Sequence, residues 1–368
     1  MSQQAQLQPE DIADPPGQRE TLLATQRRST RLEAAIASDP ASFRVLSGDR
    51  PTGALHLGHY FGTLRNRVLL QNAGVELFVL IADYQAISDR TVTARLREDV
   101  LGLVADYLAI GVDPARATIF AHSQVAALNQ LMLPFLSLVS MAEVNRNPTV
   151  RSEIATLGEA SVSALMFSYP VHQAADILSC HANVIPVGKD QLPHVELTRS
   201  IARRFNDRYS PDEPYFREPA ALLSEAPLLL GLDGRKMGKS LRNAVAIGAT
   251  ADETARLIAS ARTDAEPSIS FDPERRPEVS NLLLIAALCR DTSPAEMAAE
   301  IGGRGAAALK AAATSAVNDR FAEIRRRRTE LASDPGHLRS VLAAGAERAA
   351  AIAGETLDKV RSLMHTRY

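Results

Sequence analysis

The chain has 368 residues, of which 46% are hydrophobic and 23% charged, and its formal net charge is −2. This length exceeds that of most single cores, so we expect two folded units and a tail. The charge balance excludes a generally basic nucleic-acid-binding protein, although it leaves room for a local basic patch.

Other classes of protein are also disfavoured. No apolar run is long enough to span a bilayer, so a membrane role is not expected. The first residues, MSQQAQLQPEDIADPP, lack the apolar segment of a secretory signal, which favours a cytoplasmic protein. Cys180 and Cys289 are the only cysteines, too few for a disulfide scaffold or a cysteine-rich zinc site.

Residues 1–42 begin with a polar stretch that contains proline and end in a helix-like segment at 19–38. We interpret them as a mobile N-terminal extension with one possible helix. Such tails are mostly solvated, and binding of a protein partner is the less favoured alternative.

From residue 43 the pattern alternates between strand-like and helix-like segments. Short apolar runs typical of strands occur at 43–49, 75–83, 117–123 and 183–188. Segments with helical period separate them, at 55–71, 93–111 and 128–144. This alternation predicts an α/β unit over residues 43–245 with a doubly wound, Rossmann-like parallel sheet. Alanine-rich helical stretches without strand candidates follow, which predicts a second, all-helical domain over residues 246–368.

The stretch PTGALHLGH, at 51–59, lies where the first strand gives way to a helix. In a doubly wound fold, ligands bind beyond the carboxyl ends of the strands, next to helix N-termini. Gly53 and Gly58 allow a close approach of the backbone, and His56 and His59 lie on one helical face, where both can donate to phosphates. A metal pair or surface histidines remain alternatives, although a metal would need a third ligand.

A second candidate for phosphate binding is the loop LDGRKMGKS at 232–240. Its lysines Lys236 and Lys239 are three residues apart and bracketed by glycines. They could neutralise a triphosphate during an in-line displacement. A single loop of this kind is more often a solvated turn, so the prediction depends on its occurrence together with PTGALHLGH.

PTGALHLGH and KMGKS resemble the two signature motifs of class I aminoacyl-tRNA synthetases, usually written HIGH and KMSKS. The segments SGDRPTGALHLGHYFGTL, FSYPVHQAADILSC and VGKDQLPHVELTRSIARRFN are similar to segments of bacterial tryptophanyl-tRNA synthetases. The resemblance runs from about residue 43 to 361. It implies the class I synthetase type of Rossmann-like fold, activation of L-tryptophan with ATP and Mg²⁺, transfer to tRNA(Trp), and a homodimer.

The resemblance also implies roles for individual residues. His56, His59, Lys236 and Lys239 would be catalytic through positioning and charge, without a protein nucleophile or a protein-bound metal. The ATP contacts would be Arg50, Pro51, Thr52, Gly58, His59, Gly188, Lys189, Asp190, Leu228, Lys236, Met237, Gly238, Lys239 and Ser240. Gly238 departs from the family motif, which has serine there, and Gln85 stands where a histidine is common.

The amino-acid pocket is expected around Asp176, whose carboxylate can accept the N–H of an indole ring. On a helix, Tyr169, Gln173 and Asp176 share one face, and Gln191 is a candidate for the amino or carboxylate end of the substrate. Asp176 as a helix-surface or N-cap residue is the disfavoured alternative. A phenol could donate to the same carboxylate, and Gln173 is similar to the tyrosyl-tRNA synthetase pattern, so tyrosine is the second candidate. A synthetase-like paralogue that adenylates an amino acid and has a regulatory or partner-binding role is a further alternative.

The helical domain is the candidate for tRNA binding. Residues 304–368 hold twelve Lys and Arg against seven Asp and Glu, with Arg325-Arg326-Arg327-Arg328 the densest part. A solvated helix face would have similar charges. The apolar segment 131–141 is a candidate for the dimer interface, although a buried core helix would look alike.

Overall fold

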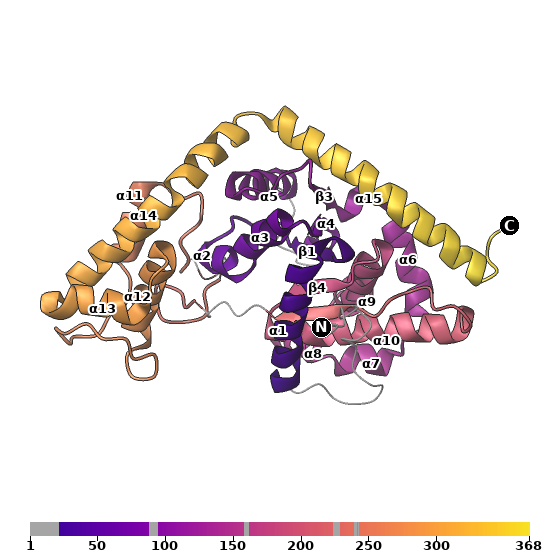
Figure 1. The fold of residues 1–368 in the computed structure, drawn as a ribbon, viewed down its shortest axis with the longest axis horizontal. Coiled ribbons are helices and arrows are strands. Elements are labelled where there is room, and N and C mark those ends of the chain that lie inside the picture. The colour runs from indigo at the N-terminus through magenta and orange to yellow at the C-terminus, as the bar shows by residue number, and fades with distance from the viewer. Residues whose placement is uncertain (1–21, 88–94, 158–161, 224–228, 239–240, 242) are drawn as a thin grey trace, which may run out of the picture.

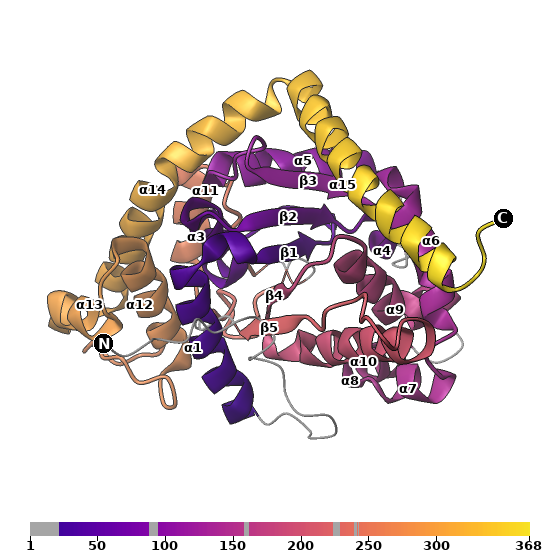
Figure 2. The same ribbon diagram turned by 45° about the vertical axis from the view of Figure 1, so that its right-hand side comes forward.

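The computed structural model describes residues 22–87, 95–157, 162–223, 229–238, 241 and 243–368. Within these residues, parallel strands form one five-stranded sheet in the order β3-β2-β1-β4-β5 (Figures 1 and 2). The strands are β1 (Arg44–Asp49), β2 (Glu76–Ile81), β3 (Ala117–Ala121), β4 (Val184–Val187) and β5 (Ala220–Leu223). The four predicted strands and the doubly wound parallel sheet are confirmed. β5 was not predicted, because Ala-Ala-Leu-Leu is too short and too rich in helix formers to indicate a strand.

Helices cover both faces of the sheet and continue into a helical region at the C-terminal side (Figure 1). The shorter ones in the first half are α2 (Leu57–His59), α3 (Arg65–Ala73), α4 (Asp83–Ala86), α6 (Ala126–Leu136), α7 (Met141–Arg146) and α8 (Pro148–Leu157). The longer ones there are α1 (Leu22–Ser38), α5 (Leu96–Ile110), α9 (Ala164–Ser179) and α10 (Leu192–Tyr209). The later helices are α11 (Ala251–Ala259), α12 (Pro277–Arg290), α13 (Pro294–Ile301), α14 (Gly305–Ala332) and α15 (Pro335–Leu363). None of the helices in the described part of the chain is both long and apolar enough to cross a membrane.

Two of the predicted helices are interrupted. The segment predicted at 55–71 consists of α2, a π-helical turn (Tyr60–Leu64) and α3. The segment predicted at 128–144 breaks between α6 and α7, where Ser140 caps α7 by accepting a hydrogen bond from the N–H of Glu143 at 3.2 Å. A capping serine followed three residues later by glutamate is a start signal for a new helix, and it overrides the apolar periodicity.

Helices from the two ends of the described chain cover the edge strands of the sheet. The C-terminal helix α15 packs along β3 (Figure 2), and Arg348 donates hydrogen bonds to the carbonyls of Pro114 and Ala117, both at 3.0 Å. α1 packs against β5, whose Leu223 N–H donates to Ser29 Oγ at 2.9 Å. Covered edges cannot pair with another chain.

The helix expected at the end of the N-terminal extension is therefore present as α1, but it is not a solvated appendage. Leu32 and Ile36 on α1 are 1% and 4% exposed, so this helix packs as part of the α/β unit. Residues 1–21 lie outside the described residues. The boundaries of the extension and of the two domains stay predictions, although α15 packs on β3 and α6 and not only on other C-terminal helices.

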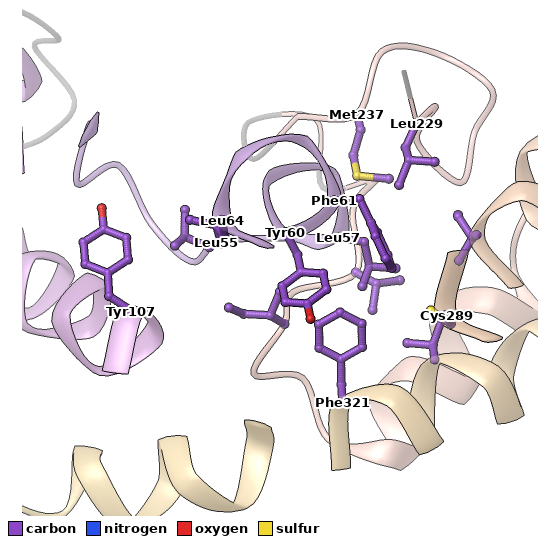
Figure 3. Packing of buried hydrophobic residues seen from close by; sticks show 14 of the residues in the cluster. Leu55, Leu57, Tyr60, Phe61, Leu64, Tyr107, Leu229, Met237, Cys289 and Phe321 are labelled. Carbon is purple, nitrogen blue, oxygen red and sulfur yellow. The ribbon is translucent and has the colours of Figure 1, made fainter. Parts of the chain in front are cut away.

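One hydrophobic cluster joins the sheet to the C-terminal helices. It includes Val45 and Leu77 from the sheet and Leu283, Leu309 and Phe321 from α12 and α14. Figure 3 shows Phe321 facing Tyr60, with Phe61 beside them. The helical region therefore supports the segment that follows β1.

Candidate active site

The strand order reverses between β1 and β4, since β1 is followed by β2 on one side and β4 lies on the other. In open α/β sheets, the ligand site lies at this switch point, beyond the carboxyl ends of the strands. PTGALHLGH follows β1, and Gly188, Lys189 and Asp190 follow β4. The fold thus brings together two strand ends, and the residues that follow each of them are predicted to bind the nucleotide.

A buried ion pair fixes the end of β1. Arg67 of α3 lies 2.7 Å from Asp49 and donates to Ser47 Oγ at 2.9 Å, and the Tyr107 hydroxyl donates to Asp49 at 2.8 Å. Burial alone would raise the pKa of Asp49, but the Arg67 guanidinium and the two hydrogen bonds hold it below its ordinary value. The carboxylate stays ionised and ties β1, α3 and α5 together directly before the histidine motif.

The two histidines of the motif are in direct contact. Their ring centroids are 3.8 Å apart, and the backbone N–H of His56 donates to His59 Nδ1 at 3.2 Å. Because Nδ1 of His59 accepts this bond, the proton of its neutral ring is on Nε2. His56 is buried and His59 is half-buried. The predicted proximity of the two side chains is present, and His59 is the more accessible donor.

Met237 and the segment 243–247 lie against this motif. The backbone N–H of Leu57 donates to the carbonyl of Val245, and that of Ile247 donates to the carbonyl of Leu55. A β-carbon added to Gly58 would lie 3.1 Å from the His56 ring and 3.2 Å from Met237 Sδ, so glycine permits the approach of the two motifs. Segments about 180 residues apart in the chain are therefore adjacent.

Asn243 organises the described part of the loop. Its side chain accepts from the N–H of Gly238 at 3.0 Å and donates to Asp233 at 2.7 Å and to the carbonyl of Lys236 at 3.1 Å. Asn243 is buried, and Lys236 is exposed. The hydrogen bonds of Asn243 fix the backbone of the loop, while the ammonium group of Lys236 stays exposed. This combination suits a phosphate-binding loop.

The other predicted nucleotide contacts are distributed around the same strand ends. Arg50, Lys189 and Asp190 are exposed, Thr52 and Gly188 are half-buried, and Pro51 is buried. Leu228, Lys239 and Ser240 lie outside the described residues. The three charged side chains Arg50, Lys189 and Asp190 are therefore accessible to a ligand.

The predicted pocket face on α9 is helical as expected. Tyr169 and Gln173 are half-buried, Asp176 is 2% exposed, and Gln191 lies at the end of the short turn before α10, half-buried. Tyr169 Oη lies 3.2 Å from Nε2 of the buried His194, whose Nδ1 lies 3.2 Å from Asn147 Nδ2. The amide of Asn147 donates, since its oxygen accepts from Thr149, so His194 donates to Tyr169 through Nε2. Tyr169 is thereby held in place.

Asp176 has a partner that the sequence analysis missed. Nε2 of His122 lies 2.9 Å from Asp176 Oδ1, and both side chains are buried at 0% and 2% exposure. His172, one turn before Asp176 on α9, lies beside His122 with ring centroids 4.4 Å apart. Two signals were available in the sequence: a polar residue directly after the apolar strand at 117–121, and the four-residue spacing of His172 and Asp176.

The tautomer of His172 follows from its neighbour. Asn129 Nδ2 donates to the carbonyls of His122 at 2.7 Å and Val125 at 2.9 Å, which leaves Asn129 Oδ1 as an acceptor. His172 Nε2 lies 2.8 Å from that oxygen and therefore carries the ring proton. Burial lowers the pKa of His172, with Asp176 opposing, so the ring is neutral at pH 7.

The four consecutive arginines are engaged within the protein. Arg325 donates to Thr254 and Asn318, Arg326 pairs with Glu323 and Glu330 on its own helix, Arg327 donates to the carbonyl of Leu108, and Arg328 pairs with Asp106. Arg325, Arg327 and Arg328 therefore connect α14 to other elements, and Arg326 pairs with glutamates of its own helix. Arg326 and Arg327 are exposed, but all four arginines have contacts within the protein and do not form a free basic patch.

Comparison with known proteins places these features in a family. The chain matches the model of tRNA synthetases class I (W and Y) over residues 39–322. A tryptophan–tRNA ligase from Streptococcus pyogenes serotype M1 is 41% identical over 336 residues, which cover 88% of this chain and 98% of that protein. One from Streptococcus pneumoniae serotype 4 is 38% identical over the same shares of both chains.

Solved structures give a consistent result. The tryptophanyl-tRNA synthetase from Campylobacter jejuni, complexed with ADP and tryptophan, has 31% identity and a TM-score of 0.76, covering 88% of this chain and 100% of that one. The tyrosyl-tRNA synthetase from Archaeoglobus fulgidus, at 22% identity and a TM-score of 0.63 over 81% of this chain and 94% of that one, shares the fold. The resemblance found in the sequence motifs is confirmed, and the chain belongs to the class I tRNA synthetases of the tryptophan and tyrosine group.

Proposed function

We propose that the protein activates L-tryptophan with ATP and transfers it to tRNA(Trp). The observation that carries the proposal is the contact between the two signature motifs at the switch point, with Met237 against Gly58 and His56, next to strand ends that precede the predicted ATP contacts. Relatives named tryptophan–tRNA ligase, which match nearly the whole chain, support tryptophan over tyrosine.

In the first step, a carboxylate oxygen of tryptophan attacks the α-phosphorus of ATP, and the bond to the β-phosphate oxygen breaks with release of pyrophosphate. The ribose hydroxyl of the terminal tRNA nucleotide then attacks the carbonyl carbon of the adenylate, and AMP leaves. Neither step needs a protein nucleophile. His59 would donate a hydrogen bond through Nε2 to a phosphate oxygen, and the ammonium group of Lys236 would neutralise charge on the phosphates.

Mg²⁺ would enter as a complex with ATP and supply additional charge neutralisation. The group of metal-binding side chains found within the described residues is His122, His172 and Asp176. Two imidazoles and one carboxylate suit a softer ion, whereas Mg²⁺ prefers oxygen ligands. The residues of the protein would therefore bind the phosphates and not the magnesium ion.

Asp176 would accept the indole N–H, with Tyr169, Gln173 and Gln191 around the rest of the amino acid. The tRNA would contact the C-terminal helices through exposed basic residues other than the engaged arginines of α14. The proposed location is the cytoplasm, where tRNA charging supplies translation. Binding of a protein partner through the N-terminal extension, residues 1–42, stays a proposal.

A homodimer is proposed with an interface on α6 and α7. Leu133 and Met141 are 69% and 78% exposed, and both lie in the apolar segment 131–141. Large apolar side chains at such exposure are typical of interfaces. Light scattering of the Leu133→Asp variant should show monomers, while Leu69→Asp on α3, which removes a leucine that is 55% exposed, should leave the dimer intact. A wild-type monomer would contradict the proposal.

Amino-acid-dependent exchange of pyrophosphate into ATP tests the activity. We expect exchange with tryptophan and little with tyrosine, followed by charging of tRNA(Trp). Exchange with tyrosine alone would assign the other specificity. Exchange without charging of any tRNA would favour the adenylating paralogue.

A further inference from the structure

We propose that His122 is a positioning residue for amino-acid recognition, which holds Oδ1 of Asp176 so that Oδ2 of the same carboxylate accepts the N–H of the substrate ring. The inference deepens the proposed function and rests on it. His122 lies outside the segments that carry the resemblance to the family.

The backbone of His122 is fixed at the carboxyl end of β3. Its carbonyl accepts from Asn129 Nδ2 at 2.7 Å and from the N–H of Val125 at 3.1 Å. Its ring is fully buried beside His172 and lies 6.3 Å, between centroids, from Tyr84. The imidazole is therefore held by rigid neighbours, as a group that orients another side chain must be.

The two oxygens of Asp176 differ in their surroundings. Oδ1 is fully buried and contacts His122 Nε2 at 2.9 Å, without the alignment of a linear hydrogen bond. Oδ2 is not among the fully buried atoms and makes no hydrogen bond within the described part of the chain. A carboxylate with one oxygen held and one oxygen open presents a single, directed acceptor.

The neighbouring His172 does not compete with His122 for the carboxylate of Asp176. Because His172 donates through Nε2 to Asn129 and is neutral, its ring brings no positive charge that would compete for the carboxylate. His122 Nε2, at 2.9 Å, is thus the contact through which Oδ1 is held. Removing it would leave Asp176 free to rotate and less well oriented for an indole N–H.

A metal ion bound by His122, His172 and Asp176 is the competing interpretation, since one ligand atom from each lies within 4.8 Å of the others. Zinc ligands at 2.0–2.1 Å in a tetrahedron stand roughly 3.3 Å apart. The contact of 2.9 Å between His122 Nε2 and Asp176 Oδ1 is shorter than this separation. Direct contact between the imidazole and the carboxylate is therefore favoured.

The test uses the full chain and three substitutions of one side chain. His122→Gln keeps an N–H donor near the position of Nε2, His122→Asn has the same amide on a shorter side chain, and His122→Leu has no donor. The assay is tryptophan-dependent pyrophosphate exchange at saturating ATP. We expect His122→Asn and His122→Leu to raise KM for tryptophan about 10- to 100-fold and to change kcat by less than about 3-fold. His122→Gln should restore KM to within about 3-fold of the wild type.

Direct binding provides a second readout. The chain contains no tryptophan, so the fluorescence of added tryptophan can be followed without a protein tryptophan background. Across the three His122 variants, the dissociation constant for tryptophan should change in the same order as KM. Their melting temperatures should not show this order.

Several results would overturn the inference. These are an unchanged KM in His122→Leu, a loss in kcat alone, an equal loss in all three variants, or stoichiometric zinc in the purified wild type that the Leu variant lacks. Failure of the proposed function is distinguishable, because wild-type protein would then show no exchange with tryptophan at all.

Discussion

Position 58 lies where the histidine motif meets the segment that contains Met237. A β-carbon there would stand 3.1 Å from the His56 ring and 3.2 Å from Met237 Sδ, closer than most real contacts of a β-carbon. Alanine is intrinsically better than glycine in a helix by about 1 kcal/mol, so the cost of a methyl group would appear in the position of the loop and not in the helix itself.

Gly58→Ala should therefore slow activation with little loss of stability. We expect kcat for pyrophosphate exchange to fall on the order of 10-fold, because small displacements of catalytic groups are costly, while the free energy of unfolding changes by less than about 1 kcal/mol. Gly62→Ala is the matched control, since a β-carbon at Gly62 meets no atom within 4 Å. Equal activity of the two variants would contradict the proposed role of Gly58.

His194 links pH to stability. Burial lowers its pKa from 6.5 to about 4, with Asp190 opposing. A depressed histidine pKa means that the unfolded chain binds more protons, so this stability is complete above pH 6.5 and is lost as the pH falls from 6.5 towards 4. The total is about 3 kcal/mol.

The His194→Gln variant should flatten that dependence. Urea unfolding at several pH values should give a free energy of unfolding whose slope between pH 4 and 6.5 is smaller than in the wild type. His337→Gln, at an exposed position of α15, should retain the wild-type slope. An unchanged slope in His194→Gln would exclude His194 as its source.

Placement of residues was predictable where local spacing determines it, whereas their roles stay predictions. His56 and His59 are in contact, and Tyr169, Gln173 and Asp176 lie on one helix, as helical periodicity predicts. The contact of His122 with Asp176 was not predictable, because it depends on where the end of β3 meets α9, a relation between residues 54 positions apart. Motif resemblance does not supply it either.

Elements were predictable where apolar runs or periodicity are long. β1 to β4 contain β-branched or aromatic apolar residues and were predicted, whereas β5 consists of alanine and leucine, which favour helices, and was not. The π-helical turn after His59 has no sequence period of its own, and the break before α7 depends on the cap at Ser140. The packing of α1 and α15 on the sheet edges is tertiary, so no local pattern reports it.

Gly345 is the closest contact between α15 and the sheet. A β-carbon at this position would lie 1.8 Å from the carbonyl oxygen of Ile119 in β3, and the backbone cannot yield as a side chain would. Gly345→Ala should therefore displace the helix from the edge strand. The expected loss is about 3 kcal/mol or more in the free energy of unfolding, at the upper end of overpacking.

Gly354→Ala is the control on the same helix, where a β-carbon would meet nothing within 4 Å. It should stabilise the protein by about 0.5–1 kcal/mol through the unfolded state and helix propensity. Thermal unfolding of both variants checks the pair. A Gly345→Ala protein as stable as the wild type would mean that α15 does not pack tightly on β3.

At the scale of the whole molecule, the sheet and the C-terminal helices share one core. The cluster that contains Val45 also contains Leu309 and Phe321, and Arg328 of α14 pairs with Asp106 of α5. Two units that share a core should not unfold independently. We therefore expect a single calorimetric transition for the described regions of the chain.

Phe321 tests both the shared core and its effect on the active site. It is fully buried, and its ring centroid lies 4.8 Å from that of Tyr60 and 6.3 Å from that of Phe61, in the segment directly after His59 (Figure 3). Phe321→Ala should lower the free energy of unfolding by about 3–5 kcal/mol and lower the temperature of the single transition without splitting it. It should also reduce kcat for exchange, because the histidine motif loses support.

The control is Leu309→Ala on the same helix. It should lower the free energy of unfolding by about 2–5 kcal/mol and leave kcat close to the wild-type value at a temperature where both variants are folded. Two separate transitions in the wild type would contradict the shared core, and equal kcat values in the two variants would show that α14 stabilises the fold without supporting the site.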